Sequence, residues 1–206
     1  MRILYLNPNS TAAMTDSMAQ VAREAAPGQE ILAWTNAGGP PAIQGPQDGD
    51  RVVPQLLAML PAAREAGAEA IVIGCFDDTG LAEMRAAAHC PVIGIGQAAY
   101  HMAALRAGRF AVVTTLEVSR PVIEANIRDQ GFAEICSAVI ASGIPVLEVE
   151  AGAPAMLERL AECARKTAAP AVVLGCAGMA RHRARLEARA GRPLIDGVAA
   201  AARQAG

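Results

Sequence analysis

Short, nearly continuous apolar runs alternate along the whole chain with alanine-rich stretches of helical spacing. This order is typical of β-α units and predicts parallel sheets, and because the apolar runs are hardly interrupted by polar residues, their strands are expected to be covered on both faces. The predicted strands are 3–6, 30–35, 70–74, 91–95, 110–114, 134–141 and 171–175. The predicted helices are 11–25, 50–66, 79–88, 97–107, 119–130, 153–168, 179–190 and 197–204. The expected fold class is α/β.

The two halves of the chain look like versions of one plan. ILYLNPNST opens the first half as FAVVTTLEV opens the second, and AIVIGC late in the first half parallels AVVLGC late in the second. The residues that end these four strands are then expected at the carboxyl edges of the sheets, where open α/β sheets bind ligands. These residues are Asn7, Cys75, Thr114 and Cys176. If the halves face each other, one cleft collects all four loops.

Composition narrows the class of partner. A chain of 206 residues with 53% hydrophobic residues can bury a sizeable core. Its formal charge of −2, without a basic stripe, favours a small-molecule partner over nucleic acid or a membrane surface. No apolar run is long enough for a signal or spanning segment. The five cysteines form neither C-x-x-C pairs nor zinc-like clusters, so we expect a reduced, cytoplasmic protein without a metal site.

A Gly/Pro-rich stretch, NAGGPPAIQGPQDGD at 36–50, predicts a long loop. In a compact domain such a loop usually covers or lines a site. A solvated connection explains the same composition equally well, and the sequence leaves both interpretations open.

Cys75 and Cys176 share one local pattern, because each follows a glycine at the end of an apolar strand and precedes a helix-forming stretch. A helix N-terminus is expected to lower the pKa of such a thiol from about 8.5 toward neutrality, which makes a thiolate base available. Packing explains either cysteine alone, since free cysteine is among the most buried residue types. Two matching thiols across one pocket, however, satisfy what racemisation without a cofactor requires: one group removes a proton and another delivers one to the opposite face. The other cysteines, Cys90, Cys136 and Cys163, are interpreted as packing residues.

The sequence does not favour an organic cofactor. A pyridoxal phosphate racemase needs a lysine for its Schiff base, and the one lysine, Lys166, lies on a helix among charged neighbours. GIGQAAY at 94–100 lacks the final glycine of a dinucleotide fingerprint, and no phosphate-binding GxxxxGK[ST] loop occurs.

Removal of a proton next to a carbonyl forms an enolate, so such a site must donate hydrogen bonds to its oxygen. NPNST offers Asn7, Asn9 and Ser10, and the second half offers Thr114 and Thr115 at the matching position. A turn with a helix cap, and a strand exit, explain the same residues structurally.

Five segments follow one another along the chain: NPNST, GCFDDTGL around Cys75, FAVVTT, LGCAGM around Cys176, and PLIDGVAAA. Together they resemble the hydantoin and allantoin racemases of the Asp/Glu racemase superfamily over essentially the whole chain. The resemblance implies two pseudo-symmetric flavodoxin-like lobes, an active-site cleft between them, no metal or organic cofactor, and catalytic residues Cys75 and Cys176. It further implies that the final helix crosses back, giving a first lobe of 1–97 plus 195–206 and a second of 98–194. We also expect a homo-oligomer.

Differences from the superfamily patterns bear on the substrate. Amino-acid racemases of the superfamily usually have Cys-Asn-Thr and Cys-Thr-His, whereas here Phe76-Asp77 and Ala177-Gly178 follow the two cysteines. This favours a flatter, less charged ligand such as a hydantoin ring. GCFDDTGL also departs from the GCFGDPGL usual in hydantoin racemases, and Gln97 stands where that family often has Glu. The predicted substrate-binding residues are Asn7, Asn9, Ser10, Phe76, Asp77, Thr114, Thr115, Ala177 and Gly178.

The leading hypothesis is racemisation at C5 of 5-substituted hydantoins or of allantoin, with Cys75 and Cys176 alternating as base and acid. Other reactions of the superfamily are amino-dicarboxylate racemisation, maleate isomerisation and decarboxylation of malonates. Decarboxylation needs only one cysteine, so the presence of two argues against it. A hypothesis of another class is a non-catalytic, small-ligand-binding α/β domain.

Overall fold

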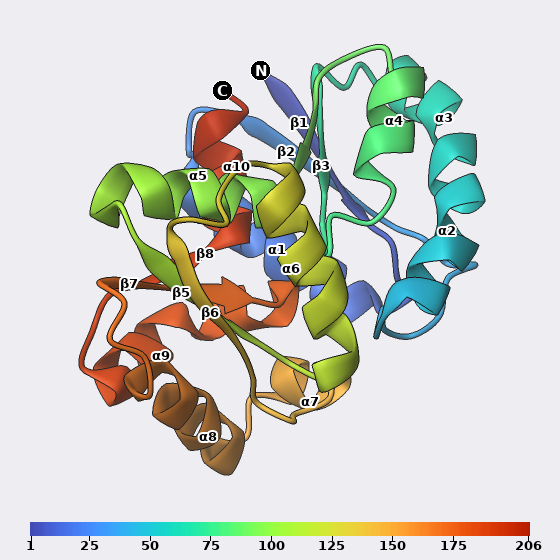
Figure 1. The fold of residues 1–206 in the computed structure, drawn as a ribbon. Coiled ribbons are helices and arrows are strands. Elements are labelled where there is room, and N and C mark those ends of the chain that lie inside the picture. The colour runs from blue at the N-terminus through green and yellow to red at the C-terminus, as the bar shows by residue number, and fades with distance from the viewer.

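Two four-stranded parallel sheets form the framework of the computed structural model, which describes all 206 residues (Figure 1). The first sheet contains β1 (Arg2–Asn7), β2 (Glu30–Thr35), β3 (Ala70–Ile73) and β4 (Val92–Gly94). The second contains β5 (Phe110–Thr114), β6 (Cys136–Ala141), β7 (Ala171–Gly175) and β8 (Leu194–Asp196). The strand orders β2-β1-β3-β4 and β6-β5-β7-β8 are the same when counted from the first strand of each sheet. This repetition agrees with the duplicated plan read from the sequence and confirms the α/β fold class.

Ten α-helices and two 3-10 helices connect the strands. In the first half they are α1 (Ala12–Ala25), α2 (Pro46–Ala58), α3 (Leu60–Glu65), α4 (Leu81–Ala87) and α5 (Ile95–Ala107). In the second half they are η1 (Glu117–Ser119), α6 (Arg120–Asp129), α7 (Val146–Ala151), α8 (Pro154–Arg165), η2 (Ala177–His182), α9 (Arg183–Ala190) and α10 (Gly197–Gln204). None of them is both long and apolar enough to cross a membrane.

Besides shifted boundaries, such as the start of α2 at Pro46 inside the stretch predicted as a loop, three differences change the number of strands and α-helices. The single helix expected at 50–66 is two helices, α2 and α3, because Pro61 has no backbone N–H to continue the hydrogen bonding of α2. Strand β8 was not predicted, since three residues are too few to show a period. Helix α7, also unpredicted, has only six residues and follows Pro145.

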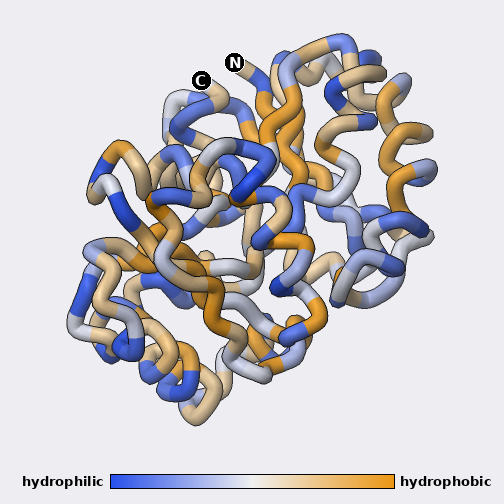
Figure 2. Tube along the Cα trace, in the orientation of Figure 1, coloured by the Kyte–Doolittle hydropathy of each residue, from blue (hydrophilic) through white to orange (hydrophobic).

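The core is continuous between the two halves. One cluster of buried residues contains Tyr5 and Val72 of the first sheet together with Phe110 and Val173 of the second. Helix α10 packs against both α1 and α5, and the hydroxyl of Tyr5 donates a hydrogen bond of 2.8 Å to the carbonyl oxygen of Val198 in α10. Figure 2 shows apolar residues concentrated along the strands. The division into lobes of 1–97 plus 195–206 and 98–194 stays a prediction.

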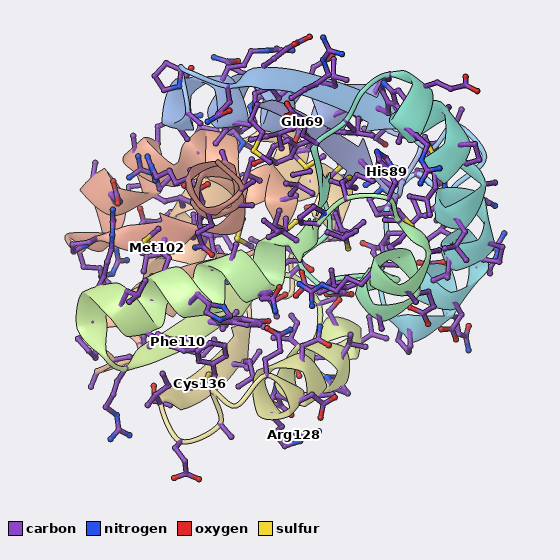
Figure 3. The ribbon with its side chains drawn as sticks, turned by 90° about the horizontal axis from the view of Figure 1, so that it is seen from above. Glu69, His89, Met102, Phe110, Arg128 and Cys136 are labelled. Carbon is purple, nitrogen blue, oxygen red and sulfur yellow. The ribbon has the colours of Figure 1, made fainter.

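The three cysteines interpreted as packing residues lie against this interior. Cys163 is buried in the core of the second half, and Cys90 packs against the core of the first. Cys136 begins β6, where it is paired with Phe110 of β5 (Figure 3). None of the three lines the pocket described next.

Candidate active site

The carboxyl ends of the two sheets meet at a small pocket that both halves line. The first half contributes Asn9, Met14, Ile43, Gly74, Cys75, Phe76 and Asp77, and the second contributes Thr115, Ser119, Val146, Gly175, Cys176 and Ala177. Cys75 follows β3 and Cys176 follows β7, which are strands at equivalent places in the two sheets. The sequence expectation that duplicated strand ends bring the two thiols to one pocket therefore agrees with the structure.

Cys75 lies in a turn rather than at the start of a helix. The helix expected from residue 79 begins only at Leu81, after Gly80 in a left-handed conformation with φ of 71°. Two other groups donate hydrogen bonds to Cys75 Sγ: the hydroxyl of Thr79, at 3.4 Å, and the backbone N–H of Asp77. The turn between β3 and α4 therefore supplies the donors that we had expected from a helix end.

Cys176 does precede a helical turn. It occupies the N-cap position of η2, and the backbone N–H groups of Gly178 and Met179 donate hydrogen bonds to its sulfur. The expected donors are therefore present, but they belong to a 3-10 helix, and α9 begins only at Arg183.

The prediction that both thiol pKa values fall toward neutrality is wrong. Burial raises the pKa of Cys75 far above its ordinary value, and burial raises the pKa of Cys176 to about 12. The hydrogen bonds act in the opposite direction in each case but are outweighed, because a buried thiolate loses its hydration. The carboxylate of Asp77 adds to both increases. Both residues are therefore thiols at neutral pH in this conformation.

The NPNST segment positions one amide donor at the pocket. Asn9 Oδ1 accepts hydrogen bonds from Asn7 Nδ2 at 3.0 Å and from the backbone N–H of Thr11 at 2.9 Å. Asn9 Nδ2 has only the thioether sulfur of Met14 as a partner, at 3.6 Å, and a thioether is a weak acceptor. The orientation of the amide is thus fixed by its oxygen, and its N–H groups remain available to a substrate.

Asp77 and Asp78 have different environments although they are neighbours in sequence. Asp78 is fully engaged, because its carboxylate accepts 2.8 Å hydrogen bonds from the backbone N–H groups of Gly96 and Gln97 at the start of α5. The carboxylate of Asp77 has no hydrogen-bond partner, while its backbone carbonyl accepts a hydrogen bond from Asn126. Burial is the main cause that raises the pKa of each carboxyl to about 7.

Five of the predicted substrate-binding residues line the pocket: Asn9, Phe76, Asp77, Thr115 and Ala177. Four others do not line it: Asn7, Ser10, Thr114 and Gly178. Among these, Asn7 holds Asn9, and the hydroxyl of Thr114 joins β5 to β7 by donating to the carbonyl oxygen of Gly175 at 3.0 Å. A Cβ atom on Gly178 would lie 3.2 Å from Glu150 Oε2, so side chains are crowded there. Direct substrate contacts by these four residues stay predictions.

Four lining residues were not singled out from the sequence: Met14, Ile43, Ser119 and Val146. Met14 lies in the first turn of the helix after NPNST, where helical spacing offered a signal. Ile43 belongs to the Gly/Pro-rich stretch 36–50, so this stretch lines the site, which was one of its two interpretations. Val146 begins the unpredicted helix α7 and carried no signal.

No group of three or more His, Cys, Asp or Glu side chains is arranged to hold a metal ion. The pocket brings two thiols from opposite halves together beside amide and hydroxyl donors.

Known proteins are similar to this chain over almost its whole length. A sequence model of the Asp/Glu/Hydantoin racemase family matches residues 3–205. A hydantoin racemase of Rhizobium meliloti is 41% identical over 211 residues, which cover 100% of this chain and 87% of the relative. The match therefore includes both halves of the chain.

Solved structures agree with the sequence relatives. An allantoin racemase from Klebsiella pneumoniae is 40% identical, with a TM-score of 0.93 over 100% of this chain and 86% of that one. An allantoin racemase from Pseudomonas fluorescens is 31% identical, with a TM-score of 0.92 over 100% of this chain and 89% of that one. The two-lobed fold and the resemblance found in the sequence are confirmed, and the chain is an isomerase that belongs to the Asp/Glu/hydantoin racemase family.

Proposed function

We propose that this protein racemises 5-substituted hydantoins or allantoin at C5, with Cys75 and Cys176 as the two groups that exchange protons with the substrate. The observation that carries the proposal is the placement of two thiols, a half-buried one at Cys75 and a buried one at Cys176, from equivalent strand ends of the two halves, on one pocket. The names of the relatives, hydantoin racemase and allantoin racemase, support the class of substrate.

The reaction needs one thiolate and one thiol at a time. The thiolate removes the C5 proton, an S–H bond replaces the C–H bond, and the electron pair passes to the neighbouring carbonyl oxygen as an enolate. The thiol on the opposite face then protonates C5 and becomes the thiolate. Charge on Cys176 raises the pKa of Cys75 further, so each thiolate disfavours ionisation of the other, and once one thiol has ionised the second stays protonated as the reaction requires.

Donors at the pocket are suited to the enolate. Asn9 Nδ2 is left with only a thioether partner, and the side-chain hydroxyl of Thr115, which also lines the pocket, has no hydrogen-bond partner. Groups that are already oriented when charge develops stabilise a transition state without further reorganisation. We assign these two side chains to the oxygen of the enolate.

The pocket disfavours an amino-dicarboxylate substrate. Its lining contains no lysine, arginine or histidine, whereas Asp77 brings a carboxyl group to its wall. Two substrate carboxylates would meet no positive side chain and one acidic one. A neutral ring with N–H and carbonyl groups fits this lining better.

We propose that the pocket widens when a substrate binds. The pocket volume is about 30 Å³, far below the roughly 300–1,000 Å³ that is usual for a small-molecule site. One contact that closes it runs from the stretch 36–50 to α7, where Gln44 Oε1 accepts a hydrogen bond of 3.2 Å from the backbone N–H of Val146. We propose that this contact opens when a ring enters.

Solvent deuterium exchange tests the proposed function. The protein is incubated in D₂O with single enantiomers of several hydantoins, allantoin, aspartate and glutamate, and both C–H exchange and optical rotation are followed. We expect exchange at C5 with loss of rotation for one or more cyclic ureides and none for the two amino acids. Exchange of no cyclic ureide would contradict the proposal, and a binding domain would show this result.

The hydrogen bond from Thr79 to Cys75 predicts a change in the pH dependence of kcat/KM when Thr79 is replaced. The hydroxyl of Thr79 stabilises the Cys75 thiolate, so Thr79→Val is expected to raise the pKa of Cys75 further. A hydrogen bond to a charged group contributes about 1.5–3 kcal/mol, so the rising alkaline limb of kcat/KM moves upward by about one pH unit or more. Thr79→Ser keeps the hydroxyl and should keep the wild-type profile. An unshifted limb in Thr79→Val, with Thr79→Ser active, would remove Thr79 from the site chemistry.

A further inference from the structure

Asp77 lines two cavities at once. One is the cysteine pocket, and the other lies beside it at the start of α2 and α4. The second cavity has a volume of about 210 Å³, far more than the cysteine pocket, and it is open on one side. The side chain of Asp77 therefore stands between the two thiols and the larger cavity.

The wall of the second cavity is acidic and sparse in side chains. Its acidic residues are Asp50, Asp77, Asp78 and Glu83, and no lysine, arginine or histidine lines it. Three glycines, Gly45, Gly49 and Gly80, also form part of the wall. Such a wall suits a group that donates hydrogen bonds and carries positive charge.

Asp77 has a backbone that is held by hydrogen bonds and a carboxylate that has no hydrogen-bond partner. Its backbone N–H donates to Cys75 Sγ and its carbonyl accepts from Asn126 Nδ2 at 2.8 Å, so both backbone groups hold the residue in place. Its carboxylate has no partner, in contrast to that of Asp78, which is bonded to the start of α5. Asp77 is half-buried, so its free carboxylate is accessible to a ligand and can accept charge-assisted hydrogen bonds from it.

We propose that Asp77 selects substrates whose C5 substituent ends in N–H donors, and that it favours a cationic guanidinium or ammonium group over a neutral ureido group. The ring then lies at Cys75 and Cys176, and the substituent passes Asp77 into the second cavity. This inference rests on the proposed racemase function and specifies the C5 substituent, which the proposed function does not define.

The alternative role of Asp77, electrostatic control of the thiols, acts on all substrates alike. Its carboxylate raises the pKa of both thiols, so removing the charge changes the reactivity of the cysteines whatever substituent is bound. A ratio of kcat/KM between two substrates cancels this common effect. A change in the ratio therefore measures only how the enzyme distinguishes the two C5 substituents.

The test measures kcat/KM for 5-(3-guanidinopropyl)hydantoin and allantoin, each divided by that for 5-isobutylhydantoin. Asp77→Asn retains an acceptor oxygen but no charge, so the guanidino ratio is expected to fall about tenfold or more while the allantoin ratio falls less than about threefold. Asp77→Ala removes the acceptor as well, and both ratios are expected to fall. Asp129→Asn, which neutralises an exposed carboxylate at the end of α6, is the matched control and should leave both ratios unchanged.

Three results have distinct meanings. Ratios that stay at wild-type values in both Asp77 variants, with 5-isobutylhydantoin still racemised, overturn the role of Asp77 and leave the racemase function intact. A fall of the allantoin ratio alone in Asp77→Ala identifies the ureido group as the ligand and contradicts the preference for a cation. Wild-type protein that racemises none of the three hydantoins overturns the proposed function itself.

Discussion

Alanine at either Cys75 or Cys176 is expected to abolish racemisation, with a fall in turnover of about 10²–10⁴-fold or more. Each thiol is the group that the proposal places on one face of C5, and no other acid or base from the lining replaces it on that face. The remaining titratable side chain of the pocket is Asp77, which comes from the same half as Cys75. Chiral chromatography of single-enantiomer hydantoins measures the loss.

Deuterium exchange at C5 distinguishes the two single variants, which a loss of racemisation alone does not. With Cys176 removed, Cys75 still reaches one face, so it takes the proton from one enantiomer and returns a solvent deuteron to the same face. The Cys176→Ala variant is therefore expected to exchange C5 of one enantiomer without inverting it, and Cys75→Ala to exchange the other. This pattern also assigns each cysteine to its enantiomer.

The matched control is Cys136→Ala, because Cys136 is a half-buried free thiol outside the pocket. It should racemise at the wild-type rate. Cys75→Ser and Cys176→Ser test folding, since serine nearly preserves the volume of cysteine but is a far weaker base at neutral pH. Undiminished racemisation by the doubly substituted Cys75→Ala/Cys176→Ala protein would refute the two-thiol mechanism.

The sequence predicted the placement of the two thiols because that placement follows from backbone pattern alone. Gly74-Cys75 and Gly175-Cys176 each end a continuous apolar run, and parallel strands bring such ends to one edge of a sheet. The equal strand order of the two sheets then gives both cysteines equivalent positions. Repetition in the sequence was thus sufficient to pair residues 101 positions apart.

The protonation state of these thiols could not be predicted in the same way. Local sequence indicates the donors, namely the turn at Thr79 and the N–H groups of Gly178 and Met179. It does not indicate how completely the opposite half of the chain covers them. Burial is a property of the closed tertiary structure, and here it outweighs the local hydrogen bonds.

The part of the pocket wall formed by the stretch 36–50 and by α7 was the least predictable from the sequence. Ile43 and Val146 approach from a Gly/Pro-rich stretch and from a six-residue helix, neither of which has a long apolar period. The two segments are joined by Gln44 Oε1, which accepts a hydrogen bond from the backbone N–H of Val146 across 102 positions of sequence. Contacts between two irregular segments leave no periodic signal in either one.

Asn9→Asp is expected to lower kcat by about 10²–10³-fold, the usual effect of removing one donor from an oxyanion site. The substitution keeps an Oδ1 acceptor for Asn7 Nδ2 and for the backbone N–H of Thr11, so the NPNST turn is preserved. It replaces only the Nδ2 donor, and a negative charge there also opposes the enolate. Because the enolate develops after binding, the loss should lie mainly in kcat, with KM changed much less.

Asn9→Ala separates the donor from the turn. Alanine loses the donor as well, so a similar fall in kcat is expected, but it also loses the acceptor that two hydrogen bonds require. Its free energy of unfolding should therefore fall by about 1–3 kcal/mol relative to Asn9→Asp, measured by urea denaturation. If Asn9→Asp kept the wild-type kcat while Asn9→Ala was only less stable, Asn9 would be a turn residue and the enolate oxygen would have to be stabilised from the second half, by Thr115.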